Sequence, residues 1–172
     1  MNLQSDDFKL FGLVQKFSQD RTAIDTQWKA LQREVHPDKF AAQGASAQRV
    51  AMQWSVRINE AYQRLKDPLK RAAYLCELNG APTNAENNTA MPAEFLVQQI
   101  EWREALDEAK TFESMHKIAL CALEYGREQL LKIEQAIDTD VNFELATHHI
   151  RALMFIERFA SEVESRIDQL QE

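Results

Sequence analysis

The stretch LQREVHPDKFAAQ, residues 31–43, separates two runs of helical periodicity and decides how the first half of the chain folds. The run before it places four apolar residues on one narrow helical face: Ile24, Trp28, Leu31 and Val35. Asp20 or Thr22 is a suitable N-cap for this run. Pro37 disfavours helical geometry at the preceding residue, His36. The sequence therefore predicts a helix that ends at Val35 and a tight turn around Pro37.

The run after the turn, Ala45–Lys66, predicts a second and longer helix. Its apolar residues again share one stripe: Ala51, Trp54, Ile58, Ala61 and Leu65. Asp67-Pro68 ends this run for the same steric reason as the first. Two helices with facing apolar stripes and a short connection should form an antiparallel hairpin. We expect residues 8–13 to pack across its base and residues 69–79 to form a further short helix.

The second half of the chain begins with a change in composition. The segment NGAPTNAENNTAMP, residues 79–92, is polar and rich in turn residues, which is typical of a linker. Three helical runs follow, at about residues 93–109, 112–137 and 143–170, and their short breaks favour an up-down-up bundle. The sequence therefore predicts an all-α protein with domains at residues 1–80 and 93–172, joined by a linker at residues 81–92.

Hydropathy and cysteine usage argue against several kinds of protein. No apolar run approaches the roughly 18–20 residues that span a bilayer. Acidic residues stand near the N-terminus, where a signal peptide would be basic, so we expect a cytoplasmic protein without a membrane role. Cys76 and Cys121 belong to no CxxC pair, and we expect both to be small core residues. The sequence indicates neither a metal site nor a cofactor.

The charge of the chain is unevenly distributed. Residues 1–80 contain 12 Lys/Arg and 9 Asp/Glu, a net charge of +3, whereas residues 81–172 contain 8 and 18, a net charge of −10. The acidic second half argues against a nucleic-acid groove there. The first half is too weakly basic to indicate one. The two halves are instead expected to face different partners, or one partner and solvent.

The tripeptide His36-Pro37-Asp38 is by itself compatible with ordinary helix termination. Its context favours a functional turn, because Lys29 and Arg33 lie on the solvent face of the preceding helix. The end of the second helix and the residues after it read INEAYQRLKDPLKRAAY, residues 58–74. These features together resemble a J-domain, whose hallmark is HPD in the loop of an antiparallel helical hairpin.

The resemblance extends over essentially the whole chain and is more specific than a J-domain alone. Three segments carry it: FKLFGL at residues 8–13, HPDKF at 36–40 and EFLVQQIEWREALDE at 94–108. They resemble the HscB-type co-chaperones of iron–sulfur cluster assembly, which pair an N-terminal J-domain with a C-terminal three-helix bundle. The resemblance implies that the chain stimulates the ATPase of a DnaK-class, HscA-type chaperone. It also implies that the chain delivers an IscU-type iron–sulfur scaffold protein to that chaperone and is itself no enzyme.

The resemblance also implies which residues bind the chaperone: His36, Pro37, Asp38, Lys29, Arg33 and Lys39. Asp38 is expected to accept a bidentate contact from an arginine of the chaperone. Pro37 should fix the turn and His36 should supply a second directed contact. The three basic side chains are expected to steer the J-domain toward an acidic patch.

The helix expected at residues 93–109 carries more apolar residues than its core stripe requires. Phe95, Trp102 and Leu106 form that stripe, whereas Leu96 and Ile100 lie roughly 100° or more away from it. In the last helix, Phe155 falls outside the stripe expected to face the core: Leu145, Ala152, Ile156, Val163, Ile167 and Leu170. Periodicity alone leaves open whether the additional apolar residues are buried on a wide face or exposed as a partner site.

By resemblance to the HscB family, the additional apolar residues and two acids beside them are expected to bind the scaffold: Leu96, Val97, Ile100, Glu101, Glu104 and Phe155. The residues alone leave other functions open. The bundle could recognise a different client of a J-domain protein, or the chain could be a plain helical scaffold with an accidental HPD. An enzyme would need paired carboxylates or a Cys/His constellation, which the sequence does not show. His116, His148 and His149 lack ligand spacing and are expected on helix surfaces or in the core.

Overall fold

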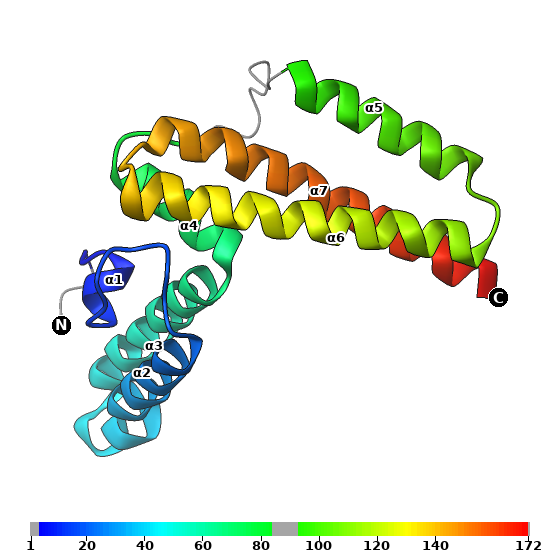
Figure 1. Cartoon of the computed structure of the whole chain (residues 1–172). Helices are drawn as coiled ribbons and strands as arrows, with labels where there is room; N and C mark the ends of the chain where they lie inside the picture. Colours follow the sequence, from blue (N-terminus) through cyan, green and yellow to red (C-terminus); the bar gives the residue numbers. More distant parts are fainter. Residues whose placement is uncertain (1–3, 84–92, 172) are drawn as a thin grey trace. The chain divides into compact units, whose positions relative to one another are not determined.

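The computed structural model describes residues 4–83 and 93–171 (Figure 1). These residues form helices and contain no β-strand, which confirms the all-α prediction. The chain divides into two compact units, Met1–Leu75 and Cys76–Glu172. The division falls inside helix α4 (Pro68–Leu78), a few residues before the predicted end of the first domain. Most of the predicted linker lies outside the described residues.

The first unit is built on the antiparallel hairpin of α2 (Arg21–Val35) and α3 (Ala45–Lys66), as predicted (Figure 1). The Asp20 carboxylate caps α2 by accepting a hydrogen bond from the Thr22 N–H. The facing stripes are buried at Ile24, Leu31, Val35, Ala51, Ile58, Ala61 and Leu65. Burying each Ile, Leu or Val side chain of this set contributes about 1.5–3 kcal/mol. The hairpin therefore has its own apolar core.

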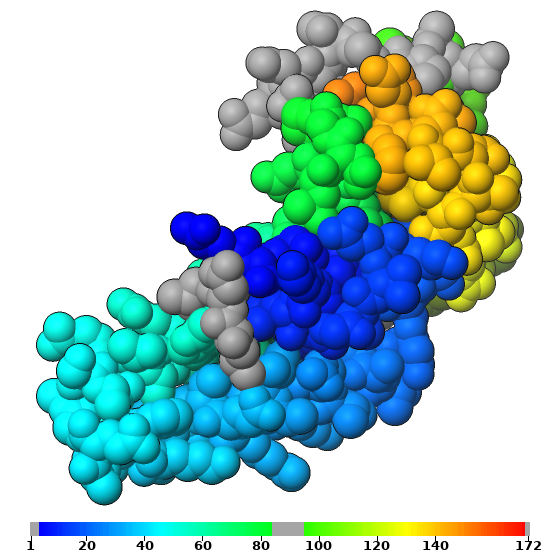
Figure 2. Space-filling view, turned by 90° about the vertical axis from the view of Figure 1, so that its left-hand side faces the viewer, coloured from blue at the N-terminus to red at the C-terminus, as the bar shows by residue number. Residues whose placement is uncertain are grey.

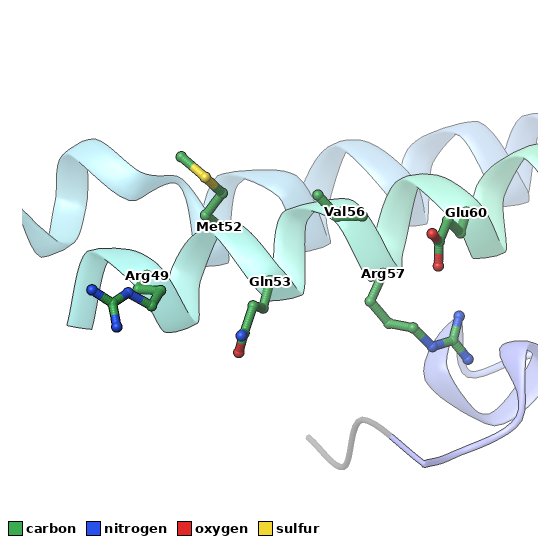
Figure 3. A pocket seen from close by; sticks show the side chains of 6 residues that line it. All are labelled: Arg49, Met52, Gln53, Val56, Arg57 and Glu60. Atoms are coloured by element: carbon green, nitrogen blue, oxygen red, sulfur yellow. The ribbon is translucent and has the colours of Figure 1, made fainter. Parts of the chain in front are cut away.

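Helix α1 (Asp7–Leu10) packs against α3 and confirms the expected position of residues 8–13 at the base of the hairpin. Sequence reasoning missed the ion cluster that holds it. The Asp7 carboxylate is completely buried, 2.6 Å from Arg57 Nη2 and 2.8 Å from Arg64 Nη1. Figure 3 shows Arg57 reaching from α3 toward this N-terminal segment. A buried carboxylate needs such partners, because leaving it unpaired would be strongly destabilising.

The second unit contains α5 (Ala93–Glu108), α6 (Phe112–Glu134) and α7 (Phe143–Gln171), which form the predicted bundle. Helices α6 and α7 lie side by side along much of their length (Figure 1), and a π-helical turn, Gln135–Thr139, follows α6. Helix α5 joins their core through the predicted stripe. The main apolar cluster consists of Phe95, Leu106, Ala122, Ala152, Ile156, Phe159 and Val163, with Trp102 packed against it.

Two predictions about this core are wrong. Leu145 and Leu170 are exposed, whereas Ala146, Ile150 and Leu153 are buried. Near its start, α7 is also covered by the chain after α4, since Arg151 Nε donates to the Thr83 carbonyl at 2.8 Å. The face of α7 that is buried near its start differs from the face buried further along, where Ala152, Ile156 and Val163 point into the core, so a single stripe extrapolated along the helix does not describe it.

The two cysteines differ in environment. Cys76 is buried, as predicted, and burial raises the pKa of its thiol to about 11. Cys121 is exposed, so its predicted place in the core is wrong. Its neighbour Ala122 occupies the core face of α6, and one residue along a helix turns the side chain by about 100°.

Candidate functional site

The HPD turn joins the two long helices of the hairpin. His36 ends α2, and Pro37–Gln43 form a short 3₁₀ helix, η1. The Asp38 backbone N–H donates to His36 Nδ1 at 3.3 Å, and Asp38 Oδ2 lies 3.5 Å from the same nitrogen. A neutral imidazole that accepts the amide proton at Nδ1 carries its own proton on Nε2. The turn thus orients the ring while leaving an N–H group for another molecule.

The polar side chains of the turn are open to solvent. The His36 side chain is 57% exposed and the Asp38 side chain 90% exposed, and no residue of η1 is fully buried. Gly44 then begins α3 with a φ of +93°, a conformation that side-chain-bearing residues rarely adopt. In Figure 2 the hairpin tip, light blue to cyan, forms part of the visible surface. The turn contributes little to the core and presents a carboxylate on a conformationally restricted backbone.

The basic residues assigned to chaperone binding lie on the exposed side of the hairpin. Lys29 and Arg33 are exposed one helical turn apart on α2, and Lys39 is exposed in η1. Arg21, at the start of α2, is instead engaged by the Asp25 carboxylate at 3.0 Å. Tyr62 donates a hydrogen bond to the same carboxylate, and this bond together with Arg21 lowers the pKa of Asp25. On α2, the basic residue farthest from the HPD turn is therefore the one engaged by a carboxylate, and Lys29 and Arg33 lie nearer the turn.

On the outward side of α5 the additional apolar residues are exposed, which answers the question that helical periodicity left open. The apolar side chains of Leu96, Val97 and Ile100 are 46–57% exposed. Glu101 and Glu104 are also exposed, and Gln98 Nε2 donates to Glu101 Oε2 at 3.2 Å. The core stripe of α5 points the other way, into the bundle. We call the five exposed residues Leu96, Val97, Ile100, Glu101 and Glu104 the α5 face.

The sequence predicted that Phe155 lies outside the core, and this prediction is wrong. Its ring is half-buried and packs at 5.7 Å from the Phe95 ring and 6.1 Å from the Phe159 ring, measured between centroids. It also stacks with Trp102, and the Arg103 guanidinium lies over it at 5.8 Å. Phe155 packs against the bundle core because α5 covers this side of α7. Helical periodicity within α7 could not reveal that cover.

Comparison with known proteins identifies the family. The family model described as "HSCB C-terminal oligomerisation domain" matches residues 91–164. A co-chaperone protein HscB homolog from Burkholderia cenocepacia is 42% identical over 174 residues, covering 99% of both chains. One from Paraburkholderia xenovorans is also 42% identical and covers 99% of this chain and 98% of its own length. The chain belongs to the HscB family.

Solved structures of HscB proteins agree with this assignment. Chaperone HscB from Vibrio cholerae superposes with a TM-score of 0.83 at 33% identity, covering 96% of this chain and 99% of its own. Human co-chaperone protein HscB gives a TM-score of 0.86 at 26% identity, covering 99% of this chain and 84% of its own. The J-domain-plus-bundle fold and the role of an HscB co-chaperone in iron–sulfur cluster assembly, implied by the sequence resemblance, are confirmed.

The first unit of this HscB-family chain has two hollows that sequence reasoning missed. One, of about 360 Å³, lies beside the HPD turn and is lined by apolar residues including Val35, Phe40 and Trp54. The other, of about 290 Å³, lies along α3 (Figure 3), where Met52 and Val56 are exposed.

Within the described ranges, no group of three His, Cys, Asp or Glu residues is placed to hold a metal ion. Among the described helices, none combines the length and hydropathy of a membrane span.

Proposed function

We propose that this chain stimulates ATP hydrolysis by an HscA-type chaperone of the DnaK class and delivers an IscU-type scaffold protein to it. The observation that carries the proposal is the presence of two different exposed sites on one chain. The hairpin carries the HPD turn, and the bundle carries the apolar α5 face. In this proposal residues 1–80 act as the J-domain, residues 93–172 bind the scaffold, and residues 81–92 connect them. The proposed location is the cytoplasm.

The chaperone contact centres on Asp38. Its exposed carboxylate can accept two parallel hydrogen bonds from a guanidinium, the geometry that gives arginine–carboxylate pairs their strength. Pro37 restricts the backbone, and the Nδ1 contact with the Asp38 amide directs His36 Nε2–H outward for a second contact. Lys29, Arg33 and Lys39 add a positive field, which acts mainly on the rate of association. ATP is hydrolysed in the chaperone, so no residue of this chain is assigned a catalytic role.

The scaffold contact uses apolar area rather than charge. Leu96, Val97 and Ile100 form an exposed cluster of a kind that commonly marks a protein-binding site. Glu101 and Glu104 supply a polar rim that sets orientation. Phe155 contributes at the edge of this site, mainly by holding α5 against α7 through its ring contacts with Phe95 and Trp102.

Scaffold titration tests the second site. Leu96→Ala combined with Ile100→Ala should weaken scaffold binding by several hundred-fold or more, because central apolar anchors contribute about 2 kcal/mol or more each and about 1.4 kcal/mol is a factor of ten in affinity. Leu120→Ala with Leu123→Ala is the matched control, since these α6 leucines are similarly exposed in the same unit. Unchanged scaffold binding by the α5 variant, or equal weakening by the control, would remove the α5 face from the proposal.

Chaperone stimulation tests the first site. In a single-turnover assay, Asp38→Asn should lose stimulation of the chaperone ATPase while its scaffold affinity and thermal unfolding stay unchanged. The matched control is Asp20→Asn, because asparagine also caps helices well and the change leaves the turn intact. A folded Asp38→Asn variant that stimulates like the wild type would refute the role of the turn.

A further inference from the structure

The tip of the hairpin carries an apolar hollow of about 360 Å³, which we call the tip hollow. Its wall is formed by the end of α2, by η1 and by the first turns of α3. Among the described residues that line it, one is polar, Gln43, and the others are apolar: Val35, Phe40, Ala47, Val50, Ala51 and Trp54. Val35 directly precedes His36, and η1 contains Asp38. The tip hollow is therefore continuous with the HPD turn.

The tip hollow exists because the core stripe of α3 begins with small side chains. Ala47 and Ala51 occupy this stripe one helical turn apart, and Trp54 is its first large side chain. Phe40 and Trp54 are only half-buried, and Val50 is 49% exposed. The apolar wall therefore remains open to solvent instead of being filled by the chain's own core.

Water is a poor occupant of the tip hollow. A buried water molecule needs about two to four polar partners. Among the lining residues, Gln43 alone offers a polar side chain. An apolar group that displaces such poorly bonded water gains affinity, since apolar area is removed from water on both sides. The chemistry of the wall therefore selects an apolar side chain as the occupant.

Basic side chains stand at the edge of the tip hollow. Lys39 precedes Phe40 in η1, and Arg49 precedes Val50 in α3, and both basic residues are exposed. A complementary partner carries acidic groups around its apolar side chain. The chaperone surface that the proposed function assigns to the HPD turn has this charge, whereas the scaffold is assigned to the other unit. The tip hollow and the HPD turn therefore fit one partner.

We propose that the tip hollow receives one apolar side chain of the HscA-type chaperone, next to the arginine that pairs with Asp38. This inference rests on the proposed function and adds an apolar anchor to a contact otherwise made by charge. Pockets that close around one buried side chain are typical of interface hot spots. The Asp38 contact is required for stimulation itself, whereas the tip hollow sets the concentration at which the chain binds.

Titration of the chaperone ATPase with the full chain separates these two roles. Ala47→Leu fills the tip hollow from its own wall. It should raise the half-maximal concentration by about tenfold or more, because it excludes an apolar anchor. The maximal stimulation should stay unchanged, because Asp38 remains in place. The matched control is Ala30→Leu, at an exposed position of α2 that does not line the tip hollow.

A second variant keeps the shape of the wall and changes only its chemistry. Val50→Thr adds a hydroxyl group that an apolar occupant leaves without a hydrogen bond, so it should also raise the half-maximal concentration several-fold. Val14→Thr is its control, since Val14 is likewise exposed in the first unit. If thermal unfolding shows that Ala47→Leu is destabilised, Val50→Thr carries the test, because its position is exposed. The effect of either variant should be the same at low and high salt, as expected of an apolar contact.

Folded Ala47→Leu and Val50→Thr variants with the wild-type half-maximal concentration would overturn the tip hollow and leave the role of Asp38 intact. Variants that instead change scaffold affinity, or the sedimentation of the chain, would also overturn it, because the occupant would then be the scaffold or a second copy. Asp38→Asn, measured alongside, should lose stimulation at every concentration. A wild-type chain that gives no stimulation would remove the proposed function and this inference with it.

Discussion

The hairpin and the bundle hold their exposed sites by different means. In the hairpin, polar side chains link α2 to α3: Trp28 Nε1 and Gln32 Nε2 both donate to Asn59 Oδ1, at 2.9 and 2.8 Å. In the bundle, α5 is held mainly by aromatic packing, with the Trp102 ring against the rings of Tyr125 and Phe159. Directional bonds suit a turn that presents one carboxylate. Apolar packing on one side suits a helix whose other side remains available for an apolar contact.

The largest expected effect is on the stability of the hairpin. Asp7→Ala leaves Arg57 and Arg64 without their buried carboxylate and should lower the free energy of unfolding of the first unit by about 3–5 kcal/mol. Amide hydrogen exchange resolves the two units and should show faster exchange in α2 and α3 than in α6 and α7. Asp6→Ala is the control, because it removes only the cap of α1 and should lower the stability by about 1 kcal/mol.

In the bundle, the comparison is between Phe155 and Ile100, two apolar residues that helical periodicity placed outside the core stripes. Phe155→Ala should destabilise the second unit by about 2–4 kcal/mol, since it removes a half-buried ring and its contacts with Phe95 and Phe159. Ile100→Ala should change stability by about 0.5 kcal/mol or less, as expected of a surface position. Chemical denaturation measures both. Equal destabilisation would contradict the distinction between the α5 face and its support.

Phe155 and Ile100 also illustrate which features of the structure could be predicted from the sequence. The bounds of α2 and α3 were predictable because their signals are local: a capping Asp20, Pro37 after the first helix and Pro68 after the second. The exposed α5 face was predictable because this helix carries more apolar residues than its core stripe requires. The place of Phe155 was not, because it depends on how α5 crosses α7. The Asp7 cluster was not predictable either, since Arg64 lies 57 residues away in sequence.

A smaller effect should follow from charge alone on the hairpin. Lys29→Glu with Arg33→Glu should slow association with the chaperone by about tenfold at low salt and reduce the dependence of that rate on ionic strength. Stopped-flow binding measures this rate. Lys110→Glu, in the connection between α5 and α6, is the control and should leave the rate unchanged. An association rate that is independent of salt in the wild type would count against steering.

The smallest expected effect is a pH dependence confined to the bundle. His149 Nδ1 lies 2.9 Å from Gln129 Oε1, and burial together with nearby Lys132 lowers the pKa of His149 below its ordinary value of 6.5. The unfolded chain therefore takes up this proton more readily than the folded one. The second unit should be most stable above pH 6.5 and lose this contribution as the pH falls toward the lowered pKa. Thermal unfolding of His149→Gln should depend less on pH across this window than that of the wild type.

The most direct test of the central claim asks whether the two sites must belong to the same chain. Single-turnover ATPase of an HscA-type chaperone with the scaffold present is measured with Asp38→Asn, with Leu96→Ala plus Ile100→Ala, and with both proteins mixed. If the chain delivers the scaffold to the chaperone, the mixture should give no more stimulation than the α5 variant alone, because no molecule carries both intact sites. Recovery of wild-type stimulation by the mixture would contradict the account.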